Sequence, residues 1–421
     1  MDTLVSLPQS EHLFLLIGSN PLPNAVAGKL LTAPGGKITF LCSHDSFQVA
    51  LRLQGWLKDQ GFPKENLRHP KKVGESQPAS IAQGVHAELQ AVNARRVGLH
   101  YTGGTKAMSV HAYRVVEQWA QERRKKGQEV ETVFSYLDAR TLQMVFDPPD
   151  PTSGERGHTE YIGQAVKLQL KDLLKLHDWI LKHEPTTQPT LPATARALAL
   201  TCTESSAFQD WQQWIQDELR AKCRRPNKEE WKGANALSSV SLSLPELSSL
   251  AEIVRTLQSD INLASGNLTL QQAAFGESAE HFCEWLDGKW LEHHVLDVLN
   301  HLAPNLELEQ CAQNIETQEV QFDVDVVALR GYQLFAFSCS TGSKKGLLKT
   351  KLFEAYIRAR QLGGDEGRIA LVCCSNDPDG LEYEMRRDVD PEGRIRVFGS
   401  KHLADLVTHV GQWIRSQSKE A

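Results

Sequence analysis

The residues whose types and spacing could do chemistry are clearest between positions 100 and 109, where small and hydroxylated residues follow an apolar segment. Gly103 and Gly104 let a backbone approach a ligand closely, and Thr102 and Thr105 offer hydroxyl groups. Lys106 adds a cation beside amides that are unpaired at the start of a helix. This arrangement predicts a phosphate-binding site, and an ordinary strand-to-helix turn is the structural alternative.

The elements that must position these residues follow from the hydrophobic pattern. An apolar strand is expected over 96–101, and apolar residues at helical spacing predict a helix over 105–126. A second apolar strand, over 13–17, ends in Gly18-Ser19-Asn20, and a third is expected over 38–42. Alternating strands and helices predict a parallel sheet, in which ligands bind beyond the carboxyl ends of the strands. The loops should therefore face one crevice.

Standard nucleotide motifs are missing from the sequence, which contains neither a glycine-x-glycine-x-x-glycine turn nor a Walker loop. That disfavours a dehydrogenase or an ordinary nucleotide triphosphatase. Residues 10–150 instead resemble the CARF domain, the Rossmann-like module of CRISPR systems that binds cyclic oligoadenylates. The residues that carry the resemblance are Gly18-Ser19-Asn20 and Tyr101-Thr102-Gly103-Gly104-Thr105-Lys106-Ala107-Met108.

The resemblance implies a homodimer in which both copies hold a ring-shaped ligand, most simply cyclic tetra-adenylate, at a two-fold axis. The residues that it places at the ligand are Gly18, Ser19, Asn20, Thr102, Gly103, Gly104, Thr105, Lys106 and Met108. Met108 either packs under an adenine or belongs to the core. Slow cleavage of the ring by this domain, with Lys106 stabilising the phosphate, is a further reading.

Length and composition set limits on the rest of the chain. A chain of 421 residues predicts more than one core. The net charge of −6 gives no overall attraction to nucleic acid, so such binding would need a local basic patch. The sequence shows no signal peptide and no apolar run of membrane-spanning length, and we expect a cytoplasmic protein without membrane contact.

Three segments are expected. Residues 1–150 form the ligand-binding domain, residues 151–275 contain a linker helix over 161–182 and a region without an assigned role, and residues 276–421 form a second α/β domain. In the last segment the order of helix, hairpin, helix and strand resembles the restriction-endonuclease-like superfamily, the PD-(D/E)xK nucleases. The hairpin is expected from strands over 322–329 and 332–340, and the resemblance implies a mixed sheet.

Nucleases of this superfamily carry an Asp at the start of the hairpin and Glu-x-Lys on its second strand, which together bind a divalent metal and orient water. Asp325 matches the Asp, and Glu292 matches an additional acidic residue on the first helix. Ser338 and Ser340 stand where the Glu and Lys are expected, on one face of the strand. A serine cannot replace the anionic oxygen of a carboxylate at neutral pH.

The missing charges could come from the following helix. Glu354 could supply the carboxylate, with Lys344, Lys345 or Lys351 as the ammonium group, so that Glu292, Asp325 and Glu354 bind Mg²⁺ or Mn²⁺. Alternatively, Glu354 pairs with Arg358 on the helix surface. Asp323 should point away from Asp325.

The resemblances together imply a metal-dependent nuclease of type III CRISPR defence that a cyclic oligoadenylate activates and that cleaves DNA or RNA. The alternative is a regulator or ligand sponge whose nuclease fold has lost catalysis, which Ser338 and Ser340 favour. The sequence leaves open the ring size, the type and strandedness of the nucleic acid, and the metal.

Overall fold

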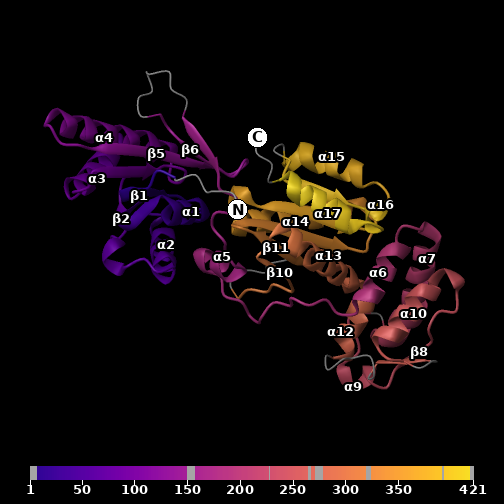
Figure 1. The fold of residues 1–421 in the computed structure, drawn as a ribbon. Helices are drawn as coiled ribbons and strands as arrows, with labels where there is room; N and C mark the ends of the chain where they lie inside the picture. Colours follow the sequence, from indigo (N-terminus) through magenta and orange to yellow (C-terminus); the bar gives the residue numbers. More distant parts are fainter. Residues whose placement is uncertain are drawn as a thin grey trace.

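The computed structural model describes residues 7–148, 157–226, 228–263, 267–270, 278–318, 324–390 and 393–417. Two separate β-sheets, each covered by helices, confirm the predicted α/β class (Figure 1). Of the positions discussed above, Asp323, the start of the expected strand over 322–329 and the expected boundaries at 150/151 and 275/276 lie outside the described residues.

The first sheet has the order β3-β2-β1-β4-β5-β6-β7. The five neighbouring strands β3, β2, β1, β4 and β5 run parallel to one another. At the edge, β6 pairs antiparallel with β5, and β7 pairs antiparallel with β6. The bounds of the strands are Ser10–Ile17 (β1), Thr32–Cys42 (β2), Lys71–Lys72 (β3), Arg96–His100 (β4), Glu131–Asp138 (β5), Gln143–Phe146 (β6) and His158–Tyr161 (β7). The sheet therefore continues past residue 150.

Helices cover both faces of this sheet, as the continuous apolar run of β1 predicts. Helices α1 (Leu22–Leu31) and α2 (Phe47–Asp59) contribute to the core on one face. Helices α3 (Pro78–Gln90) and α4 (Lys106–Lys125) contribute to the core on the other face. The predicted helix over 105–126 is confirmed as α4.

The connector between the sheets differs from the expected helix over 161–182. Its helix α5 spans only Leu170–His177, because the carboxylate of Asp172 accepts the backbone N–H of Gln169 at one end and Asp178 adopts a left-handed conformation at the other. The residues before it pack on the second sheet, where Leu168 N donates to Gly331 O at 2.9 Å. The prediction failed because apolar spacing alone does not mark helix ends.

The second sheet is mixed and has the order β10-β11-β12-β13-β14. Strands β10, β11 and β12 pair antiparallel, and β12, β13 and β14 pair parallel, so the predicted hairpin is confirmed. The bounds of the strands are Gln310–Gln313 (β10), Val326–Arg330 (β11), Gln333–Ser340 (β12), Arg368–Cys373 (β13) and Ile395–Phe398 (β14).

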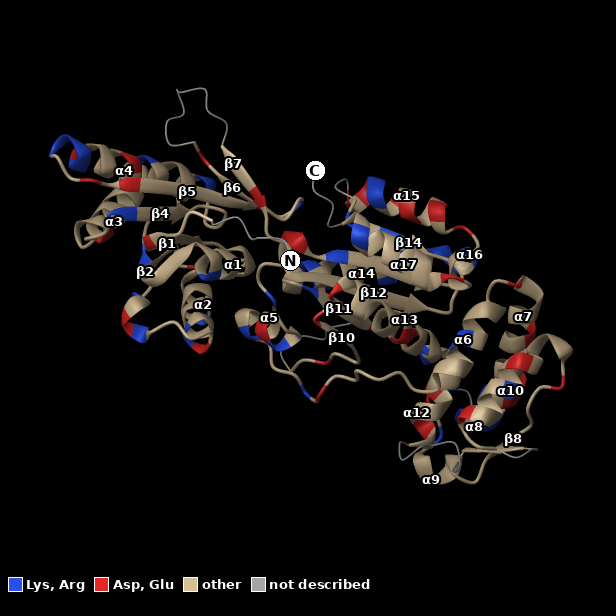
Figure 2. Ribbon diagram, in the orientation of Figure 1, with Lys and Arg blue, Asp and Glu red and all other residues tan. Residues whose placement is uncertain are grey.

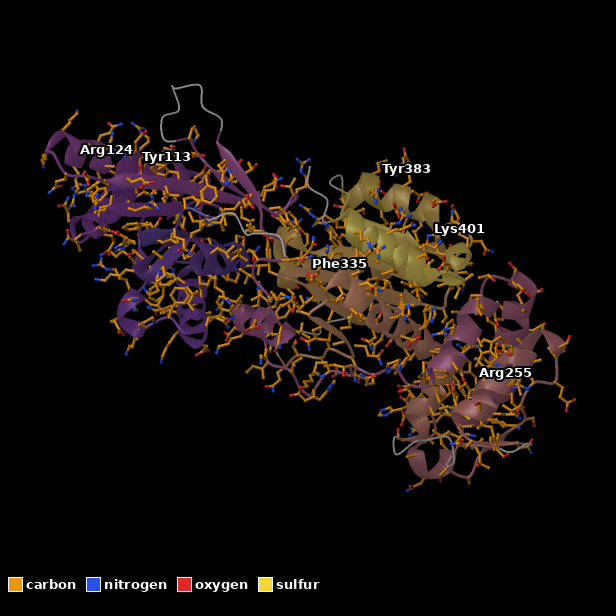
Figure 3. All side chains as sticks on the ribbon, viewed as in Figure 1. Tyr113, Arg124, Arg255, Phe335, Tyr383 and Lys401 are labelled. Carbon is orange, nitrogen blue, oxygen red and sulfur yellow. The ribbon has the colours of Figure 1, made fainter. Side chains whose placement is uncertain are left out.

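Alternation along β12 directs its side chains into two cores. Leu334 and Ala336 share one core with α14 (Lys345–Gly363), while Phe335 and Phe337 share the other with α13 (Trp290–Leu306) and α17 (Leu406–Ser416). Figure 3 places Phe335 within this unit, whereas Tyr383 of α15 (Pro378–Val389) is 67% exposed. Helix α16 (Ser400–Leu403) precedes α17.

A group of short helices from the middle of the chain packs against the α13 side of the second sheet (Figure 1). The main ones are α6 (Pro192–Thr201), α7 (Ser205–Trp214), α10 (Ala251–Asp260) and α12 (Ala279–Glu284), with α8 (Ala221–Cys223), α9 (Ala234–Leu237) and the small pair β8 (Ser241–Leu242) and β9 (Leu268–Thr269). They share buried residues with α13 in one cluster, so this region extends the second core.

Charged residues of both signs are interspersed on helices such as α15 (Figure 2). Among the helices in the described parts of the chain, none combines the length and apolarity needed to cross a bilayer.

Candidate functional site

Two glycine-containing loops meet at the carboxyl end of the first sheet because β1 and β4 are adjacent parallel strands. A Cβ atom at Gly103 would collide with the carbonyl oxygen of Leu16, and a Cβ at Gly18 would lie 3.0 Å from the amide nitrogen of Gly104. Gly104 has a φ of +76°, a conformation that favours glycine. The structure therefore brings the two predicted loops together, with their backbones in contact.

The hydroxyl groups of the second loop have structural partners. Thr102 Oγ1 accepts the backbone N–H of Leu137 at 2.6 Å. Thr105 caps α4 by accepting Met108 N–H at 3.2 Å and donates to Glu75 O at 2.6 Å. Both threonines thus hold the loop in place. The Met108 amide is used by the Thr105 cap, so an anion at this helix start would have to bind the amides that precede it.

The remaining predicted residues differ in accessibility. Lys106 and Ser19 are exposed beside the glycine loops, where a ligand could reach them. Met108 is fully buried in the core between α4 and the sheet, which is the structural alternative named above. Asn20 accepts Leu22 N–H at 3.0 Å, and its Nδ2 lies against Gly364, which directly follows α14.

Asn24 was missed by sequence reasoning. Its side chain is fully buried, Nδ2 donates to Leu16 O at 2.9 Å, and Nδ2 lies directly against Gly103. An amide on the otherwise apolar first turns of α1 was the available signal. Asn24 contacts both the end of β1 and Gly103, and so it fixes the separation between the loop after β1 and the loop after β4.

A second cluster forms at the hairpin of the second sheet. Asp325 comes just before β11, and its Oδ2 accepts the backbone N–H of Cys339 at 2.5 Å and the Ser338 hydroxyl at 3.3 Å. The antiparallel register of β11 and β12, which pairs Val326 with Phe337, brings these residues together. Ser338 therefore orients Asp325.

Glu292 and two lysines complete this cluster. Burial, followed by the negative charge of Asp325, raises the pKa of Glu292 to about 8, and the charges of Lys289 and Lys351 oppose the rise. Lys351 Nζ donates to the carbonyl oxygen of Cys339 at 3.2 Å. Burial raises the pKa of the Cys339 thiol, and Asp325 and Glu292 raise it further. Two carboxylates and two ammonium groups thus converge at one end of the hairpin.

Lys289 was not predicted. It lies one helical turn before Glu292, at the end of a π-helical segment (Trp285–Lys289) that leads into α13, and it donates to Glu284 at 2.9 Å. Burial opposes its protonation, but the bond to Glu284 and the nearby Glu292 raise the pKa of Lys289 overall. Segments of this kind are frequent at functional sites.

Glu354 does not join the cluster. It is exposed on α14, and Arg358 bonds to Gln361 at 3.1 Å in place of the expected pair with Glu354. Within the described residues no group of three or more acidic, histidine or cysteine side chains could hold a metal, so the expected set of Glu292, Asp325 and Glu354 does not come together. A helix has many outward positions, and spacing alone could not tell which of them faces the hairpin.

The remaining candidates lie outside the carboxylate pair. Ser340 is buried at the end of β12 and accepts Gly342 N–H at 3.3 Å. Lys344 is exposed at the start of α14, and Lys345 donates to Glu384 at 2.6 Å. Of the three lysines that the sequence offered, Lys351 is therefore the one that the structure places beside the cluster.

The donor set is compatible with a divalent cation. Glu292 and Asp325 offer the hard oxygen atoms that Mg²⁺ and Mn²⁺ prefer. Burial, and after it the negative charge of Asp325, raises the pKa of Glu292, and a positive ion between the two groups would oppose both effects. These two residues would hold such an ion.

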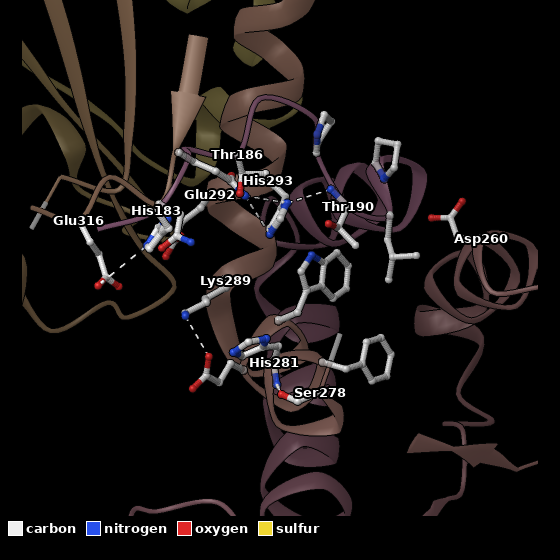
Figure 4. Close-up of a pocket in the computed structure, with 18 residues that line it drawn as sticks. His183, Thr186, Thr190, Asp260, Ser278, His281, Lys289, Glu292, His293 and Glu316 are labelled. Atoms are coloured by element: carbon white, nitrogen blue, oxygen red, sulfur yellow. Dashed lines mark hydrogen bonds and ion pairs between the residues drawn. The ribbon is translucent and has the colours of Figure 1, made fainter. Parts of the chain in front are cut away.

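A cavity of about 1030 Å³ opens beside Glu292 (Figure 4). Its wall includes Glu292, Lys289 and His293 from the helix and Gln313 from β10, and the connector around Thr190 closes it from the other side. His293 accepts Thr190 N–H at 2.9 Å, which ties this wall to the connector. Glu292 and Lys289 thus face a hollow that residues of the middle region partly form.

Comparisons with known proteins show the fold. No family model matches the sequence, and no curated protein matches it. Among solved structures, protein VC1899 from Vibrio cholerae aligns with a TM-score of 0.70 and 15% identity over 97% of this chain and 100% of that one. Can2 from Sulfobacillus thermosulfidooxidans, solved in complex with cyclic tetra-adenylate, aligns with a TM-score of 0.65 and 17% identity over 96% and 99%. This chain therefore has the two-sheet fold of these proteins over nearly its full length.

Proposed function

We propose that this protein is a cyclic-oligoadenylate-regulated, metal-dependent nuclease of type III CRISPR defence that acts in the cytoplasm. The observation that carries the proposal is the cluster of Glu292, Asp325 and Lys351 at the hairpin, in a chain with the fold of a protein solved with cyclic tetra-adenylate. Converging carboxylates and an ammonium group suit phosphodiester hydrolysis.

The ligand site of this proposal is the edge where the loops of β1 and β4 meet. The amides at the start of α4, with Lys106 and Ser19, would bind the phosphates of the ring. A ring with rotational symmetry suits a homodimer in which two copies of these loops face each other across a two-fold axis. Cyclic tetra-adenylate is the ring we expect, because the structural neighbour Can2 was solved with it.

In the second domain, Glu292 and Asp325 would hold Mg²⁺ or Mn²⁺, which supplies charge stabilisation and an activated water when bound. Ser338 and the Cys339 amide fix the orientation of Asp325. Lys351, anchored on the carbonyl of Cys339, would stabilise the negative charge that develops on the phosphate oxygens. Lys351 on α14 would then take the role of the lysine in the expected Glu-x-Lys motif.

The test is incubation of the purified protein with supercoiled plasmid and single-stranded RNA, in Mg²⁺ or Mn²⁺, with and without each cyclic oligoadenylate. We expect cleavage that needs both metal and ring and that is lost in Asp325→Asn. Ring binding without cleavage in any metal would refute the enzymatic half. Cleavage that Asp325→Asn leaves unchanged would refute the assigned site.

The alternative function is a ring-binding regulator without catalysis. Ser338 and Ser340 at the positions of the Glu and Lys favour it, as does the reduction of the predicted carboxylate set to two. In this case Asp325 only accepts hydrogen bonds that hold the hairpin together. Its replacement would change the free energy of unfolding, and cleavage would be negligible both before and after the change.

A further inference from the structure

The loop after β1 and the end of α14 form a joint between the two domains. The sequence Gly364–Glu366 follows α14 directly, and a Cβ atom at Gly364 would collide with Nδ2 of Asn20 and lie 2.7 Å from Oε2 of Glu366. Gly364 has a φ of +62°. The turn therefore needs a glycine at position 364, because of its backbone conformation and because a side chain there would displace Asn20 of the loop after β1.

Glu366 is the unusual group in this joint. Its side chain is fully buried, and neither carboxylate oxygen has a hydrogen-bond partner of full geometry among the described residues. Burial raises the pKa of Glu366 to about 7, and the amide of Asn20 is close enough to oppose that rise. Burying a carboxyl group without hydrogen-bond partners costs free energy, so the folded state depends on what the amide of Asn20 contributes. Small movements of Asn20 should therefore change the free energy of this joint.

Asn20 is oriented by its own loop. Its Oδ1 accepts Leu22 N–H at 3.0 Å at the start of α1, which leaves Nδ2 directed to the second domain. The neighbouring residues Gly18 and Ser19 belong to the loop that would contact the ring. Movement of this loop on ligand binding would therefore displace the Asn20 amide relative to Glu366.

The backbone around Glu366 is tied to the rest of both domains. Arg368 at the start of β13 donates to Glu366 O at 2.8 Å and, from Nη2, to Arg140 O at 3.1 Å in the loop between β5 and β6. Gln333 of β12 donates to Glu366 O at 3.2 Å. The joint therefore connects the loop after β1 and the β5–β6 loop with two strands of the second sheet.

Helix α14 leads from this joint to the hairpin cluster. Along the helix axis, Lys351 and Gly363, the last residue of α14, are about 18 Å apart, as the rise per residue of an α-helix gives. Buried residues such as Leu352 and Ala359 pack the helix on the sheet along this length. A displacement at Gly364 would therefore be transmitted to Lys351 as a movement of a packed helix.

We propose that the contact between Asn20 and Glu366 couples ligand binding at the loops after β1 and β4 to the second sheet. Through α14, this contact would set the position of Lys351. The inference rests on the proposed function and specifies how that site is regulated. Asn20 and Glu366 act here as positioning residues that touch no reacting atom. The ligand can regulate cleavage only by favouring one arrangement of this joint over another.

An exchange of the two side chains tests the contact. Glu366→Gln should retain binding of cyclic tetra-adenylate in calorimetry but reduce ring-dependent stimulation of cleavage at least tenfold. Asn20→Asp combined with Glu366→Gln restores an amide opposite a carboxylate, and the new Asp can still accept Leu22 N–H. We expect the double variant to recover stimulation that Glu366→Gln has lost. Glu354→Gln, the same change at an exposed position of α14, is the matched control.

Hydrogen–deuterium exchange gives a readout that does not need nuclease activity. Binding of cyclic tetra-adenylate should alter exchange at residues 363–368 and along α14 in the wild type, and the effect on α14 should vanish in Glu366→Gln. Bound ring with unchanged exchange at 363–368 would overturn the inference. Unaltered stimulation by the ring in Glu366→Gln would overturn it as well.

The proposed function can fail separately. If the ring binds and alters exchange in α14 but no metal supports cleavage, the nuclease proposal fails and the coupling stands. If no ring binds, the sensing role fails, and a double-mutant cycle on unfolding midpoints still tests the contact. Additive effects of Asn20→Asp and Glu366→Gln would then refute the coupling of the two side chains.

Discussion

Replacement of Glu292 by Gln should make the second domain more stable while it abolishes cleavage. In the wild type, burial and the charge of Asp325 raise the pKa of Glu292 from 4.5 to about 8. Between these values the unfolded chain loses the proton and the folded chain keeps it, so stability falls as the pH rises and the loss is complete above pH 8. The neutral amide of the variant removes this dependence.

The magnitude follows from the same two values. Each pH unit in this interval changes the free energy of unfolding by about 1.4 kcal/mol, so this group lowers wild-type stability by about 3 kcal/mol between pH 5 and pH 7. Glu292→Gln should match the wild type near pH 4.5 and exceed its stability by about that amount at neutral pH. Added Mn²⁺ should raise the unfolding midpoint of the wild type more than that of the variant, because a cation relieves the repulsion.

The assay is urea unfolding at several pH values, followed by tryptophan fluorescence, since Trp285 and Trp290 lie on the segment that carries Glu292. Glu354→Gln is the control, because it removes an exposed carboxyl group of the same kind. A difference between wild type and Glu292→Gln that stays constant from pH 5 to pH 8 would refute the assignment of Glu292 as a group stressed by burial and by Asp325.

Three further outcomes are expected. Gly103→Ala should weaken binding of cyclic tetra-adenylate at least tenfold in calorimetry, because its Cβ would push the two loops apart, whereas Gly55→Ala on α2 has open space and should bind normally. Lys351→Met should lower the cleavage rate by about 100-fold or more if its ammonium group stabilises developing charge, with ring affinity retained; an unchanged rate would contradict that role. Glu354→Gln should cleave at the wild-type rate in the plasmid assay, and loss of cleavage would restore the predicted role of Glu354 as a metal ligand.

Much of the architecture was accessible from local pattern. The run of apolar residues in β1, the glycine pair after β4 and the amphipathic α4 gave the parallel sheet, and the turn at Gly331 gave the hairpin. The connector was not accessible in the same way, because its leucines fit a helix over a longer stretch than the one that Asp172 and Asp178 delimit. The roles of the ligand and metal residues stay predictions.

What the sequence by itself determined is the type of each element and the loops that end at the sheet edge, since these follow from periodicity and from the conformational freedom of glycine. Tertiary structure decided which distant side chains meet: Lys351 with the hairpin, Glu292 with Asp325, and Asn20 with Glu366. These contacts join residues from different elements, and they depend on how α13 and α14 pack on the second sheet and on how that sheet meets the first. Local spacing carries no information on such packing, which is why Glu354 looked equivalent to Lys351 in the sequence and lies in solvent in the fold.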